Sequence, residues 1–151
     1  VFSIFFAFFR GSVNQEGFQI PLSFMENEAV TETIIGSAFE VMNTLGFGFL
    51  EKVYENSLKE ELLLRGLHVE QQHLLSVTYK GSEVGFYVAD LLVERVVIVE
   101  LKAVNMLIPI HSAQVINYLK AAHCPTGLLI NFGNPRLEIR RLYLNQDDNK
   151  S

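Results

Sequence analysis

Two carboxylates and one lysine interrupt the most apolar part of this sequence. Asp90 lies in the stretch VADLLV, and Glu100 and Lys102 directly follow the apolar run of residues 96–99. Because alternate side chains of a strand share a face, Glu100 and Lys102 are predicted to point the same way, with Leu101 opposite. Charges at the end of a buried strand are unfavourable unless they are paired or bind a metal. The pattern indicates a chemical site, with a plain Asp90–Lys102 ion pair as the simpler alternative.

The chemistry that these residue types favour is metal-assisted hydrolysis of a phosphodiester. Mg²⁺ or Mn²⁺ prefers oxygen ligands and keeps several waters, so Asp90, Glu100 and the Leu101 backbone carbonyl are the predicted ligands. Glu51 follows a glycine-rich turn at the start of a predicted helix and is expected to complete the acidic pocket, as a direct ligand, as a water-mediated ligand or as a ligand of a second ion. Taken alone, Glu51 is also explained by the helix dipole. Lys102 is predicted to orient or activate the attacking water, or to offset negative charge on the transition state.

Two residues later in the chain are candidate substrate contacts. Gln114 and Tyr118 are spaced i,i+4 and so share one face of a predicted helix. Their neutral donors suit a phosphate or a nucleotide, although such a pair is also typical of an ordinary polar helix face. Local attraction for phosphates is expected from three basic residues, Lys52, Lys59 and Lys120.

Composition indicates a folded domain with an acidic surface. The chain has 151 residues, 49% hydrophobic and 19% charged, with a formal net charge of −5. This balance argues against a broadly basic nucleic-acid-binding surface, so a homodimer or a partner protein is one way to supply positive charge. The single cysteine, Cys124, cannot form an intrachain disulfide and fits a reducing, cytoplasmic setting.

The first residues differ from the rest of the chain. VFSIFFAFFR is strongly apolar but too short to span a membrane, and it lacks the charge pattern of a secretory signal. Because the first methionine is Met25, we expect residues 1–24 to be an atypical apolar extension that is not part of the native domain. Residues 25–144 are then predicted to form one domain, and residues 145–151 a polar tail.

Hydrophobic periodicity predicts an α/β fold, a central mixed sheet flanked by helices. Asn27 is the expected N-cap of the first helix, and Gly46 its C-cap. The predicted helices cover about 28–45, 49–65 and 110–122. The predicted strands cover about 68–72, 74–79, 84–94, 96–103, 127–132 and 137–144.

The motifs together resemble a known family. Residues 48–54, GFLEKVY, are similar to the G-x-x-E-x-x-Y signature that names the GxxExxY protein family, and this likeness includes Tyr54. It continues through residues 90–93, 100–103, 114–119 and 127–132. That family in turn resembles the PD-(D/E)XK nuclease superfamily, with the motif order of RecB-type nucleases.

The resemblance implies a role for each matching residue. It assigns Asp90, Glu100 and Lys102 to the catalytic core and Glu51 to the helix-borne acid. The accessory and substrate-binding positions fall on Gln114, Tyr118 and Tyr54. The sequence departs from the superfamily name in one place, with Ala89 where the pattern has proline.

The function predicted is hydrolysis of DNA by a Mg²⁺- or Mn²⁺-dependent nuclease, in DNA repair or in defence against foreign DNA. The alternative is a catalytically silent or partner-dependent module that uses a nuclease fold to bind nucleic acid or protein. Metal-dependent hydrolysis of another phosphoester, such as a nucleotide or RNA, is a third reading.

Overall fold

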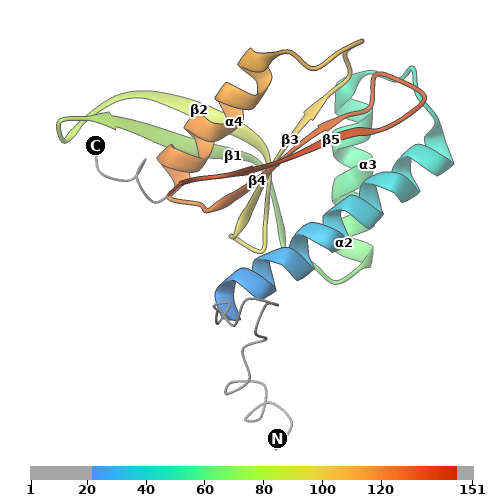
Figure 1. The fold of residues 1–151 in the computed structure, drawn as a ribbon, viewed down its shortest axis with the longest axis horizontal. Helices are drawn as coiled ribbons and strands as arrows, with labels where there is room; N and C mark the ends of the chain where they lie inside the picture. Colours follow the sequence, from blue (N-terminus) through green and yellow to red (C-terminus); the bar gives the residue numbers. More distant parts are fainter. Residues whose placement is uncertain (1–21, 146–151) are drawn as a thin grey trace, which may run out of the picture.

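The computed structural model describes residues 22–145 and shows one sheet between helices (Figure 1). The helices are α2 (Leu22–Leu45), α3 (Glu51–Leu64) and α4 (Pro109–Ala122). The strands are β1 (Val69–Tyr79), β2 (Ser82–Val93), β3 (Val97–Lys102), β4 (Thr126–Asn131) and β5 (Glu138–Tyr143). The predicted α/β class, a mixed sheet flanked by helices, is confirmed.

The order of strands in the sheet is the order in the chain, β1-β2-β3-β4-β5. Neighbouring strands are antiparallel except β3 and β4, which are parallel and are joined by α4. Parallel neighbours require such a crossover connection, whereas the antiparallel pairs need only short turns. The hairpin of β1 and β2 projects beyond the other strands, because β2 pairs with β3 only over its last three residues (Figure 1).

Each face of the sheet has its own apolar core. The helices α2 and α3 pack on one face and α4 on the other (Figure 1). The inner stripes of α2 and α3 meet β2 and β3 residues such as Leu91, Val99 and Leu101, whereas the core under α4 contains the alternate residues Leu92 and Ile98. β3 is therefore covered on both faces, which explains its continuous apolar sequence.

The first helix begins earlier than predicted. It starts at Leu22, not near residue 28, and Asn27 lies within it, its carbonyl accepting a hydrogen bond from the Thr31 hydroxyl at 2.8 Å. The residues that precede Asn27, LSFME, are mostly good helix formers and continue the helix backwards. Farther along α2, Arg141 on β5 forms a salt bridge with Glu28 at 2.9 Å and another with Glu32, which joins this part of the helix to the sheet. Residues 1–21 and 146–151 lie outside the described residues, so the proposed division of the chain stays a prediction.

The two strands predicted before residue 80 form one strand. β1 runs from Val69 to Tyr79 and pairs with β2 on both sides of Gln72, which has a φ of 54° and lies opposite Asp90 in the register. The register does not shift at Gln72, so this is a left-handed residue within a continuous pairing; the shift in register lies farther along, between Val77 and Thr78. The end of the first helix is as predicted, because Gly46 has a φ of 73° and its N–H donates to the Met42 carbonyl. None of the helices within residues 22–145 is long and apolar enough to cross a membrane.

Candidate active site

The site begins where β2 and β3 separate. The ladder between them ends at the pair Leu91 and Val99, and side chains replace the backbone bonds beyond it. Asp90 accepts a hydrogen bond from the Leu101 N–H at 2.9 Å, and Glu100 accepts one from the Asp90 N–H at 3.4 Å. We call this arrangement of Asp90 and Glu100 the carboxylate fork. Each of the two carboxylates accepts a hydrogen bond from a backbone N–H that would otherwise lack a partner. This is how two acids are accommodated at the end of a buried strand pair.

Burial makes the carboxylate fork electrostatically unfavourable in its charged form. Asp90 is 9% exposed and Glu100 is 5% exposed. Burial raises the pKa of Asp90 from 3.8 to about 6, with the charges of Glu55 and Glu51 acting in the same direction. Burial and then the charge of Asp90 raise the pKa of Glu100 from 4.5 to about 8. A group of acids with raised pKa values is typical of functional sites, and positive charge would stabilise it.

Lys102 lies beside the carboxylate fork. Its amine is 3.9 Å from a Glu100 carboxylate oxygen, on the same side of β3, while Leu101 is buried on the opposite face. The lysine charge lowers the pKa values of both Asp90 and Glu100, but less than burial raises them. The Leu101 N–H points to Asp90. In a strand, the N–H and the carbonyl of any given residue point to the same side. The Leu101 carbonyl therefore faces the fork.

The helix α3 brings two acids towards the carboxylate fork. Glu51 opens α3, and its charge raises the pKa values of both Asp90 and Glu100, so it lies within electrostatic reach of them. Glu55, one turn later on the same helix face, was not singled out from the sequence although it is only 3% exposed. The i,i+4 spacing of Glu51 and Glu55 is the signal that could have identified it.

Glu55 is joined to the carboxylate fork through Gln72, the left-handed residue of β1. One Glu55 oxygen accepts hydrogen bonds from Lys52 at 2.8 Å, Gln71 at 2.7 Å and Gln72 at 2.9 Å. The amide of Gln72 also lies 3.4 Å from an Asp90 oxygen. Gln72 thus places a neutral donor between Glu55 on the helix and Asp90 on the sheet. The polar run at residues 70–72 does not by itself identify this bridge, because the bridge depends on the position of Gln72 opposite Asp90 in the sheet.

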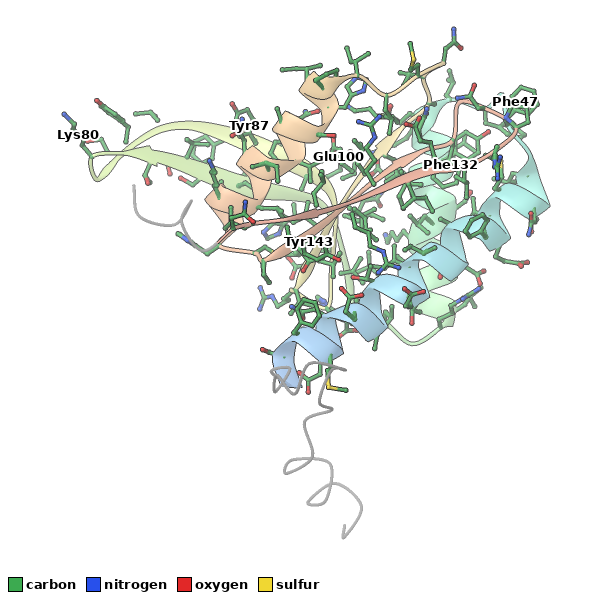
Figure 2. All side chains as sticks on the ribbon, in the orientation of Figure 1. Phe47, Lys80, Tyr87, Glu100, Phe132 and Tyr143 are labelled. Carbon is green, nitrogen blue, oxygen red and sulfur yellow. The ribbon has the colours of Figure 1, made fainter. Side chains whose placement is uncertain are left out.

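The predicted accessory pair on α4 faces the same site. The Gln114 amide donates to the Tyr118 hydroxyl at 2.7 Å. Burial raises the pKa of Tyr118, and the charges of Glu100 and Asp90 raise it further. The Tyr118 ring also packs against Tyr87 of β2, with ring centroids 5.3 Å apart. Figure 2 shows Glu100 and Tyr87 on the side of the sheet that α4 covers, with Lys80 at the far tip of the hairpin.

Tyr54 lies in a different environment from the one that an accessory residue needs. It is 0% exposed and its ring stacks on Phe132 at 4.6 Å. Its hydroxyl donates to the Gly46 carbonyl at 2.7 Å and accepts the Phe49 N–H at 3.2 Å. This corrects the expectation that Tyr54 contacts substrate, because its polar atom and its ring face are both used internally. Tyr54 instead holds the turn that precedes Glu51.

The donor set of the carboxylate fork fits a divalent cation. No group of three or more His, Cys, Asp or Glu side chains gathers closely enough to hold a metal by itself within the described part of the chain. Mg²⁺, however, is commonly bound by one or two carboxylates with waters completing its octahedron. Asp90, Glu100 and the Leu101 carbonyl supply such a set. Burial, and after it the neighbouring acids, raise the pKa values of Asp90 and Glu100, so a bound cation would stabilise their charged forms.

The fold and the site define a class, an α/β domain that gathers buried acids and a lysine at the point where two strands of a mixed sheet separate. A family model described as the PD-(D/E)XK nuclease superfamily matches residues 28–142. The chain belongs to this superfamily.

A solved structure supports the fold independently. The protein titled "Crystal structure of SSO0001" is similar with a TM-score of 0.52 and 16% sequence identity. The match covers 83% of this chain and 62% of that one, so this chain spans less than two thirds of the length of its structural relative. No curated protein matches the sequence.

Proposed function

We propose that this protein is a divalent-metal-dependent nuclease that hydrolyses phosphodiester bonds in DNA. The observation that carries the proposal is the carboxylate fork, in which buried Asp90 and Glu100 have raised pKa values and Lys102 lies 3.9 Å from Glu100. A site built only for stability would gain from apolar residues here, because buried charge is costly. Membership of a nuclease superfamily agrees with this use of the acids.

The chain's own residues have distinct tasks in this proposal. Asp90, Glu100 and the Leu101 carbonyl hold Mg²⁺ or Mn²⁺, with Glu51 acting directly or through water. The bound ion supplies positive charge at the phosphate and lowers the pKa of a water molecule. Lys102 orients the attacking water or offsets negative charge that develops on the phosphate oxygens.

The environment of the site supports further parts of the proposal. Gln72 and Lys52 both donate to Glu55, which keeps that second helix carboxylate fixed and partly neutralised.

We also propose membership of the GxxExxY family within the superfamily and a role in DNA repair or in defence against foreign DNA. The free, buried Cys124 agrees with a reducing cytoplasm. Because the chain carries a net charge of −5, a second copy or a partner protein would strengthen DNA binding.

The test is a cleavage assay on single-stranded DNA, duplex DNA and RNA with Mg²⁺ or Mn²⁺. We expect wild-type protein to cut DNA, and Lys102→Ala to lower the rate by about 100-fold or more, the range for a group that stabilises transition-state charge. Lys80→Ala, at the exposed tip of the hairpin of β1 and β2, is the matched control for loss of one positive charge. Absence of metal-dependent cleavage in wild type would favour the silent binding module. Cleavage that survives Lys102→Ala unchanged would place the chemistry elsewhere.

A further inference from the structure

A pocket lies beside the carboxylate fork, between α4 and the projecting hairpin. It has a volume of about 330 Å³ and is lined by Tyr87, Ile110, Gln114, Asn117 and Tyr118. Ligand pockets commonly have volumes of ~300–1,000 Å³, so this one suits a single ring system. Tyr118 connects the pocket to the site, since it lies within electrostatic reach of Glu100 and Asp90.

The lining of this pocket has a distinctive chemical character. It combines two aromatic rings, one aliphatic side chain and two amides, and none of the lining side chains is an acid, lysine or arginine. A neutral lining offers little to a phosphate. Aromatic faces stack on heteroaromatic rings, and Asn and Gln amides match the donor and acceptor pattern of base edges.

We infer that this pocket binds one unpaired nucleobase next to the bond that is cut, so that the substrate is single-stranded at that point. The inference rests on the proposed function, because it names the substrate class of the same site. In a duplex the base edges are paired and the faces stacked, so an α4 pocket could not reach them without extruding the base. A single strand, an overhang or a flap presents the base freely.

Tyr87 is the stacking platform in this assignment. It is 45% exposed, whereas Tyr118 is 4% exposed and packs against it. The buried ring of Tyr118 therefore supports the exposed ring of Tyr87, and the free part of Tyr87 is available to a ligand. Asn117 is exposed on α4 and supplies an amide at the pocket mouth.

The test measures binding without cleavage, by fluorescence anisotropy of end-labelled oligonucleotides in EDTA. The probes are a short DNA single strand, the same strand with abasic sites, an RNA strand of the same sequence and a blunt DNA duplex. We expect the natural single strands to bind at least about fivefold more tightly than the abasic strand and the duplex. Tyr87→Ala should bring single-strand affinity down to the abasic level, and Tyr87→Phe should retain it.

Tyr79→Ala is the matched control, because Tyr79 is 64% exposed on the same hairpin and lies outside the pocket. It should bind all probes as wild type does. Equal binding of natural and abasic strands, or no effect of Tyr87→Ala, would overturn the inference while leaving a metal-dependent nuclease intact. Conversely, base-dependent binding that Tyr87→Ala abolishes, in a protein that cuts nothing, would support the pocket and contradict the proposed catalysis. Absence of binding to every probe would overturn the pocket as well.

Discussion

Replacing Glu100 by glutamine should stabilise the metal-free protein, and increasingly so as the pH rises. The pKa of Glu100 is raised from 4.5 to about 8 in the folded protein, first by burial and then by the charge of Asp90. Between these two values the folded state binds a proton that the unfolded state has released. Stability of wild type therefore falls as pH increases from about 4.5 to about 8. Glutamine keeps the shape of the side chain but has no charge to bury.

The size of the effect follows from the shift in pKa. Each unit corresponds to about 1.4 kcal/mol, so the full shift sets a ceiling of about 5 kcal/mol. Water entry and the nearby Lys102 reduce the cost of the charge. We expect Glu100→Gln to gain about 2 kcal/mol in free energy of unfolding at about pH 9, and little at about pH 5.

Urea denaturation in EDTA at several pH values measures this gain. Glu60→Gln is the matched control, since Glu60 is exposed on the outer side of α3, and it should follow wild type at every pH. Added Mg²⁺ or Mn²⁺ should stabilise wild type more than Glu100→Gln. If wild type and Glu100→Gln keep a constant difference from pH 5 to pH 9, the claim that Glu100 is electrostatically unfavourable is refuted.

Two further substitutions test how the site is positioned. Gly127→Ala should cost about 1–3 kcal/mol of stability, because the added Cβ would lie 2.7 Å from a Val115 methyl group on α4. Its control is Gly85→Ala, where the added Cβ meets open space, and this variant should change the midpoint of urea denaturation little. Tyr54→Phe should lower the free energy of unfolding by about 1–2 kcal/mol, since it leaves the Gly46 carbonyl and the Phe49 N–H without their partner. Its control is Tyr143→Phe, which removes an exposed hydroxyl and should change the urea midpoint much less. Equal effects within either pair would contradict these contacts.

Much of the fold could be predicted because its sequence signals are local. The apolar run before Glu100 indicates a strand covered on both faces, and β3 is one. The periodic stripe of the first helix indicates burial on one side, and Gly46 ends that helix as a left-handed residue. The start of α2 differs from the prediction because Asn27, a residue type that favours N-caps, lies inside the helix. The ion pairs of Glu28 and Glu32 with Arg141 could not be predicted, since the partners are more than 100 residues apart in the chain.

The acids and the lysine of the site could also be found from sequence, because charge stands out in an apolar strand. The contribution of Glu55 was missed, since in sequence it lies among polar residues of a helix. Its burial results from Gln71 and Gln72 on β1, and Gln72 has a left-handed backbone conformation opposite Asp90. Tyr54 shows the opposite case, because a family signature marked it for the site while the structure buries it beneath the preceding turn.

The central claim, that the carboxylate fork binds a divalent cation, is tested most directly by calorimetric titration with Mn²⁺. The titration compares wild type with Asp90→Asn, which keeps the shape of the side chain, and with Glu60→Gln as a surface control. We predict saturable Mn²⁺ binding by wild type and Glu60→Gln, and its loss in Asp90→Asn. Binding that Asp90→Asn retains at full strength, or no binding by folded wild type, would contradict the account.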